Sequence, residues 1–243
     1  MFFRIARAAC LALALAAGTA AAEPGDLAEF NDAMESASSF NRVAIGYLRT
    51  GNADLASIEI DQMRVAWGKL TARFAGHRPA AFDGLTLYSN LWTRVSAHLV
   101  AADIMLKSGR FDAARQSLDA IRGDFYDLRK AAGVAVLADC VRDANAAMDA
   151  LMVYNDRALD WAKADTSDAI ASKASSYGAA LARCDGMASE PVRNSPEFRR
   201  LVDGAKASLA FIPKAIATHD TDLLHRVLIE LRSFDNLLAF RFG

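Results

Sequence analysis

Apolar side chains recur three or four residues apart along most of this 243-residue chain. This spacing places them on one face of an α-helix, so the pattern predicts amphipathic helices and not strands. The clearest series is Ala56, Ile60, Met63, Trp67, Leu70 and Phe74. Breaks at Gly and Pro predict eight helices, at about residues 26–50, 53–74, 82–108, 111–132, 134–164, 167–184, 196–216 and 221–242. Pro213 falls inside the seventh helix and should kink it.

A short turn between helices recurs along the chain. Residues 48–56 and 106–114 share one layout, with Gly ending a helix and Asp near the start of the next. The turns recur roughly every 54–58 residues, which indicates an internal repeat. Their aspartates fall in the first helical turn, where a carboxylate interacts favourably with the helix dipole. They are Asp54, Asp112, Asp168 and Asp222.

The fold class that follows is all-α, with four long helical hairpins in series. Long helices with sustained three-four spacing favour packing at about 20°, as in four-helix bundles. Gly133 separates two equal halves, so we expect one bundle over residues 23–133 and a second over 134–243. An elongated array of the same hairpins is the alternative arrangement.

The turn at residues 109–114, Gly-Arg-Phe-Asp-Ala-Ala, resembles the turn inside the repeats of tetratricopeptide (TPR) proteins. The resemblance covers the turn region alone. It implies helical-hairpin repeats, here with a repeat of roughly 56 residues.

The first 22 residues have the pattern of a signal peptide. Arg4 and Arg7 precede an apolar run at residues 8–17, which is too short to span a bilayer, and small residues end at Ala22. We therefore expect cleavage near Ala22 and export, most simply to a bacterial periplasm. No other apolar stretch approaches the roughly 18 residues of a membrane helix, so stable membrane insertion is not expected.

The charge balance argues against a nucleic-acid partner. Removing Arg4 and Arg7 from the 28 basic residues leaves 26 against 29 acidic residues, a net charge of about −3. Binding to nucleic acid depends on clustered positive charge, which this balance does not indicate.

Two cysteines, Cys140 and Cys184, remain after the signal segment. In an oxidising compartment an even pair favours a disulfide, here one that joins the fifth and sixth helices. Two buried free thiols, or metal or redox chemistry, are the alternatives.

The chain lacks the motifs of common enzyme classes. It has no haem-attachment Cys-x-x-Cys-His, His-Glu-x-x-His, phosphate-binding glycine loop, dinucleotide fingerprint or nucleophile elbow. We therefore expect a protein that is not an enzyme and needs no cofactor.

Soft ligands could form a site for copper or a non-covalent haem. The residues are His98, Met105, Cys140, Met148 and Met152. Methionines at helical spacing are also typical of core filling, which is the simpler interpretation.

An acidic face could hold a hard cation or simply be solvated. Its residues are Asp139, Asp143, Asp149, Asp156 and Asp160, while His219 and His225 form a pair without a third ligand.

Three arginines occupy one repeat position beside the apolar stripe: Arg64, Arg122 and Arg232. They could line a groove for an acidic partner, or each could pair with a neighbouring carboxylate.

The leading hypothesis is a non-enzymatic periplasmic helical-repeat protein that binds a partner protein or peptide. A homodimer is possible. The irregular segment 185–195 is a candidate contact region. The alternative is a metal- or haem-handling bundle, or one that binds a small ligand between its helices.

Overall fold

The computed structural model describes residues 24–156, 159–163 and 165–243, and this part of the chain is all-α without strands. The expected signal segment, residues 1–22, lies outside the described residues. The long helices are α1 (Pro24–Arg49), α2 (Ala53–Phe74), α3 (Thr86–Lys107), α4 (Phe111–Ala131), α5 (Leu137–Met152), α6 (Thr166–Met187), α8 (Pro196–Leu209) and α10 (Thr221–Phe242). Shorter elements are η1 (Ala80–Phe82), α7 (Glu190–Arg193) and α9 (Ile212–Ala217). The predicted all-α class is confirmed.

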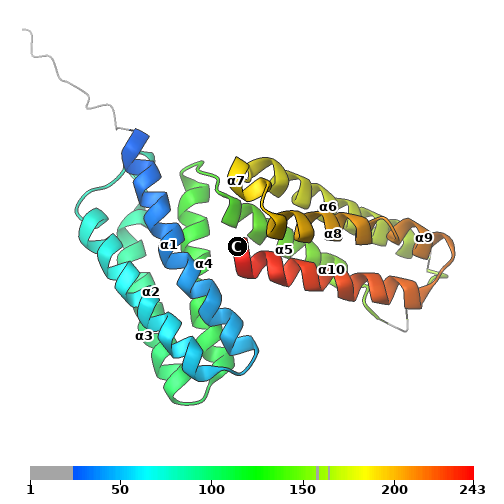
Figure 1. Ribbon diagram of the computed structural model, residues 1–243, viewed down its shortest axis with the longest axis horizontal. Coiled ribbons are helices and arrows are strands. Elements are labelled where there is room, and N and C mark those ends of the chain that lie inside the picture. The colour runs from blue at the N-terminus through cyan, green and yellow to red at the C-terminus, as the bar shows by residue number, and fades with distance from the viewer. Residues whose placement is uncertain (1–23, 157–158, 164) are drawn as a thin grey trace, which may run out of the picture.

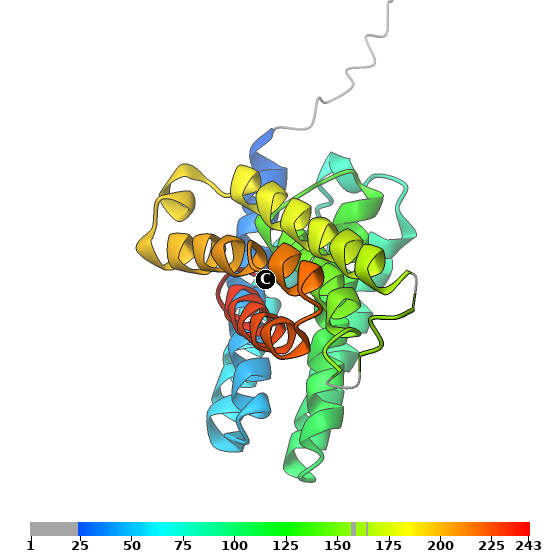
Figure 2. The same cartoon turned by 90° about the vertical axis from the view of Figure 1, so that its right-hand side faces the viewer.

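The helices form two lobes with separate hydrophobic clusters. Helices α1–α4 enclose one cluster and form the first lobe, and α5–α10 enclose the other and form the second lobe. Figure 1 shows the lobes side by side with their long axes crossing, and Figure 2 looks along the helices of the second lobe. Helices α1 and α4 face α5 and α10 where the lobes meet, and we call this junction the seam.

The predicted turns explain where the helices end. Gly51 and Gly109 have φ of 75° and 72°, a left-handed conformation that closes α1 and α3 and that other residues adopt only with strain. The Asn52 side chain accepts a hydrogen bond from the Leu55 amide and caps α2. All four repeated aspartates lie in the first turn of a helix, as predicted.

The structure corrects several helix boundaries. Helix α5 ends at Met152 and not near residue 164, and Trp161 lies beside the start of α10. There the Trp161 ring stacks on His219, and its indole N–H donates to the Thr221 hydroxyl over 2.7 Å. Helix α6 begins at Thr166, whose hydroxyl donates a hydrogen bond to the Asp160 carbonyl.

The seventh predicted helix is broken and not merely kinked. Helix α8 ends at Leu209, and α9 begins at Ile212 with Pro213 in its first turn. A proline has no N–H to donate and its ring displaces the carbonyl four residues earlier, here that of Leu209. The third helix also begins later than predicted, at Thr86, because η1 and a turn at Gly84 precede it.

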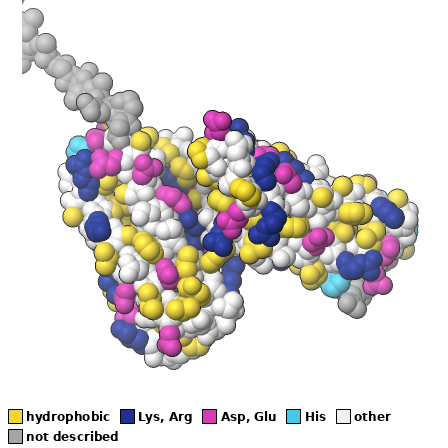
Figure 3. Space-filling model, viewed as in Figure 1, with side chains coloured by type: hydrophobic (Ala, Val, Ile, Leu, Met, Phe, Trp, Pro, Cys, Tyr) yellow, Lys and Arg dark blue, Asp and Glu magenta, His cyan; other side chains and the backbone are white. Residues whose placement is uncertain are grey.

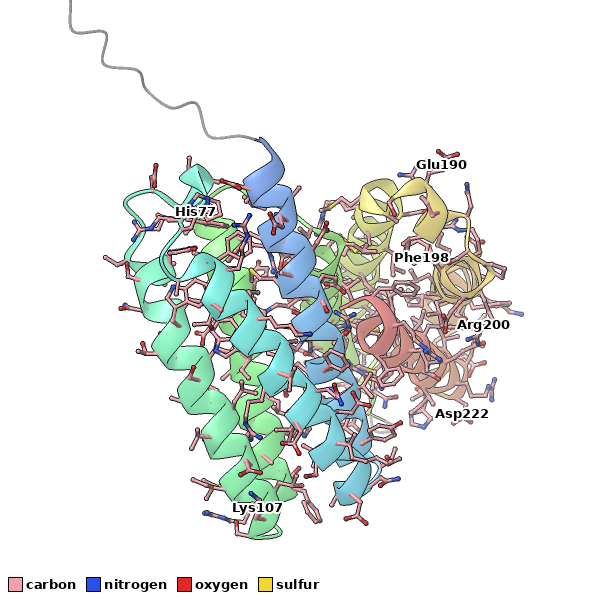
Figure 4. All side chains as sticks on the ribbon, turned by 60° about the vertical axis from the view of Figure 1, so that its left-hand side comes forward. His77, Lys107, Glu190, Phe198, Arg200 and Asp222 are labelled. Carbon is pink, nitrogen blue, oxygen red and sulfur yellow. A yellow bond between two sulfur atoms is a disulfide. The ribbon has the colours of Figure 1, made fainter. Side chains whose placement is uncertain are left out.

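The predicted apolar stripes form the cores. Every residue of the series from Ala56 to Phe74 is buried in the first lobe. Aromatic rings close one end of this lobe, where Phe30 contacts Phe74, Phe82 and Tyr88. In Figure 4, His77 and Lys107 mark opposite ends of the first lobe, while Phe198 lies among the helices of the second lobe.

Candidate functional site

An apolar groove lies on the second lobe, between α6 and the α8–α9 segment. It arises from the break at Pro213, where the chain leaves the α8 axis over Ala210 and Phe211. Opposite the break, α6 presents only small side chains, so nothing fills the space. The groove therefore results from the helix break at Pro213 together with the small side chains of α6.

The groove has a volume of about 740 Å³, and its lining is almost entirely apolar. Helix α6 contributes Ala171, Ala174, Ser175, Gly178 and Ala179, and the opposite wall contains Leu209, Ala210, Ile212, Pro213, Ile216 and Ala217. Ser175 is the only lining residue with a polar side chain. The Phe211 ring lies beside the lining residues Ala210 and Ile212 in sequence and is 52% exposed.

This lining can bind apolar surface and has no group that could act as acid, base or nucleophile apart from the Ser175 hydroxyl. The small residues of α6 recur at helical spacing, so they form a channel along the helix axis. A channel of this kind accepts the apolar face of another helix or an elongated apolar molecule. Other cavities, of about 470 and 320 Å³, are smaller and include charged side chains in their lining.

The five proposed soft ligands lie in both lobes. Met105 packs against the core of the first lobe, and His98 of α3 lies 3.5 Å from Asp124. Cys140 and Met148 belong to the core of the second lobe, and Met152 packs against it. The structure therefore does not bring the five residues into one site, because the seam separates the two cores. Among the residues described, no group of three or more His, Cys, Asp or Glu is placed to hold a metal ion.

Cys140 and Cys184 lie at disulfide distance, with their Cα atoms 5.4 Å apart. Both residues are buried, and the pair connects α5 to α6 as predicted. The pair occupies Cys140, which the soft-ligand interpretation also required.

The three repeat-position arginines point to separate places. Arg64 is exposed on α2 and pairs with Asp61, three residues earlier. Arg232 of α10 pairs with Asp149 over 2.6 Å and with Asp235 over 3.2 Å. Arg122 lies at the seam, so the three residues do not line one groove.

The proposed acidic face is divided among different partners. Asp139 forms two hydrogen bonds with Arg129, Asp143 accepts one from the Tyr126 hydroxyl, and Asp149 pairs with Arg232. Asp160 accepts a hydrogen bond from the Ala162 amide. His219 has a φ of 50° in the turn before α10, and its ring stacks on Trp161.

A buried polar cluster inside the second lobe was not predicted. Asp235 of α10 is 1% exposed, and it accepts hydrogen bonds from the Asn145 amide over 2.8 Å and from Arg232. Burial raises the pKa of Asp235 to about 6, against the opposing effect of these two donors. Burial, and then the negative charge of Asp235, also raises the pKa of Tyr177.

Sequence reasoning missed the groove, although two signals were present. Pro213 was recognised as a disturbance of its helix, and the Ala, Ser and Gly residues of α6 are visible in the sequence. The sequence did not show that the break at Pro213 and the small residues of α6 face each other in the fold.

Comparison of the chain with protein-family models, curated proteins and solved structures gives no match. No helix in the described ranges is both long enough and apolar enough to cross a membrane.

Proposed function

We propose that this protein is a non-enzymatic binding protein whose groove holds the apolar face of a helical segment of a partner protein. The observation that carries the proposal is the groove itself, about 740 Å³ of nearly uniform apolar lining on the surface. Small residues along α6 let a second helix approach closely, and Leu209, Ile212 and Ile216 supply an apolar wall. Exposed apolar surface of this kind marks interaction sites in many soluble proteins.

The partner segment should carry apolar residues spaced as i, i+3 or i+4, and i+7, because these share one helix face. A displayed library of amphipathic helical peptides, selected against the whole protein, tests this directly. Ser175→Trp places a large ring in the groove, whereas Ser176→Trp places the same ring on an exposed neighbouring position outside the lining.

The expected result is that selected peptides show the helical spacing and lose at least about tenfold in affinity for Ser175→Trp. Their affinity for Ser176→Trp should stay within about twofold of the parent value. Selected peptides without that spacing, or equal binding to both variants, would contradict the proposal.

A second candidate occupant is an apolar small molecule, because the groove volume falls within the range of roughly 300–1,000 Å³ typical of ligand pockets. A native mass spectrum of the purified protein separates the two cases. A bound small molecule adds a discrete mass that disappears in Ser175→Trp, while a peptide-binding protein has the mass of the bare chain or of its dimer.

Export to the periplasm is part of the same proposal. It is supported by the signal-like segment at residues 1–22 and by the cysteine pair at disulfide distance, since disulfides persist in oxidising compartments. The denatured intact mass of the protein from a periplasmic extract tests cleavage near Ala22. A full-length mass confined to the cytoplasmic fraction would contradict export.

A further inference from the structure

The seam between the lobes brings helices unusually close together. A Cβ atom added to Gly46 of α1 would lie 2.6 Å from the Phe240 ring of α10. Figure 3 shows Lys and Arg side chains along the hollow where the two lobes meet.

Two arginines at the seam, Arg42 and Arg122, have guanidinium N–H groups that lack hydrogen-bond acceptors among the described residues. Arg42 of α1 is 7% exposed and donates from Nη2 to Glu35 over 2.7 Å, but within the part of the chain that the structure describes its buried Nε and Nη1 atoms have no hydrogen-bond partner. Arg122 Nη1 of α4 lies 3.6 Å from Asp119, and its Nη2 atom is buried with no hydrogen-bond partner among the described residues. Buried guanidinium N–H groups are expensive to leave unpaired.

The surrounding charge is positive as well. Burial lowers the pKa of Arg122, and the nearby Arg142, Arg42 and Arg49 lower it further, while Asp119 acts in the opposite direction. Arg129 adds no free charge, because Asp139 accepts both of its hydrogen bonds. The region therefore holds an excess of positive charge that its own carboxylates do not neutralise.

Two small cavities flank Arg122, each of about 20 Å³. One is lined by Arg42, Arg49, Gly46 and Phe240, and the other by Arg129 and Arg142. A space of this size accommodates one particle comparable to a water molecule. Phosphate, sulfate and organic anions exceed it.

We propose that the cavity between Arg42 and Arg122 binds one small monovalent anion of halide size, such as chloride. An anion accepts hydrogen bonds from the unpartnered N–H groups and also neutralises charge, whereas a water molecule does only the first. Because the cavity is lined by α1, α4 and α10, the bound anion connects the first lobe to the second.

Binding can be measured by chloride-35 NMR, from the line width of the chloride signal as the whole protein is added. The expected result is a saturable excess broadening that bromide displaces. Arg122→Met should lose this component, and Arg64→Met should retain it, because Arg64 is exposed on α2 and pairs with Asp61 away from the seam. Equal broadening in both variants, or no saturable component in the parent protein, overturns the proposal.

Bromide-soaked crystals of the unmodified protein provide a test that does not depend on a variant folding correctly. An anomalous peak within hydrogen-bond distance of Arg42 Nη1 and Arg122 Nη2 supports the site. A difference peak there without anomalous signal identifies water as the occupant and overturns the proposal, as does an empty cavity.

Discussion

Reducing the Cys140–Cys184 pair should destabilise the second lobe and leave the first lobe unchanged. The pair links α5 to α6, and both helices contribute only to the core of the second lobe. Reduction of the unmodified protein keeps both sulfur atoms in the core, so it creates no cavity. The difference between the oxidised and reduced states therefore isolates the effect of the covalent link.

The magnitude follows from the length of chain that the link closes. The two cysteines are 44 residues apart in sequence. The loss of chain entropy in the unfolded state for a loop of this length corresponds to about 4 kcal/mol at 25 °C. With a urea dependence of about 2 kcal/mol/M, the unfolding midpoint should fall by about 2 M.

Tryptophan fluorescence can follow each lobe separately during urea unfolding. Trp67 and Trp92 stack in the first lobe, while Trp161 packs against the second. A Trp161→Phe variant therefore reports the first lobe, and a variant with Phe at both other positions reports the second. Each is measured oxidised and after unfolding and refolding in reductant.

The expected result is a large midpoint shift in the Trp161 signal alone. An unchanged Trp161 midpoint after reduction would show that the link contributes no stability. An equal shift in both signals would show that the two lobes unfold as one unit, which contradicts the separation of the two cores.

Three further predictions follow from single positions. The pKa of Asp235 is raised to about 6, so the folded protein binds a proton at this residue more readily than the unfolded chain and gains stability as pH falls from 7 to 4. Asp235→Asn should remove up to about 3 kcal/mol of this gain, measured by urea unfolding across that pH range. Gly204→Ala should cost about 1–3 kcal/mol in thermal unfolding, because the new Cβ would lie 2.6 Å from the Phe234 ring, whereas Gly68→Ala, with open space around it, should stabilise α2 by about 0.5–1 kcal/mol. Arg129→Met should cost about 3–5 kcal/mol in urea unfolding near neutral pH, since it leaves its buried carboxylate partner without a counter-charge, and a loss below 1 kcal/mol would show that water replaces the ion pair.

The helices were readable from the sequence because their signals are local. The series from Ala56 to Phe74 is buried as its spacing predicts, and Gly51 and Gly109 lie at the ends of α1 and α3, as the turn pattern predicts. Failures occurred where distant contacts replace local preference. The segment after Met152 leaves the helix and packs Trp161 against residues on the turn before α10, far along the chain.

The candidate sites show the same division more sharply. The repeat position of Arg64, Arg122 and Arg232 suggested one surface, but each residue lies on a different helix with different neighbours. The soft-ligand set likewise joined residues that the seam keeps in separate cores. A shared position within a repeat fixes the side of a helix and not the direction in which that helix faces.

The sequence by itself determined the all-α class, the order of the long helices and their buried faces, because each depends on residues near one another in the chain; it favoured a disulfide between Cys140 and Cys184 without excluding free thiols. Only the tertiary structure decided that the lobes cross at the seam, that α6 faces the break at Pro213, and that Arg42 and Arg122 line one cavity. These outcomes depend on how helices with similar apolar stripes pack against one another. Many pairings bury such stripes almost equally well, and close contacts such as Gly46 with Phe240 select among them.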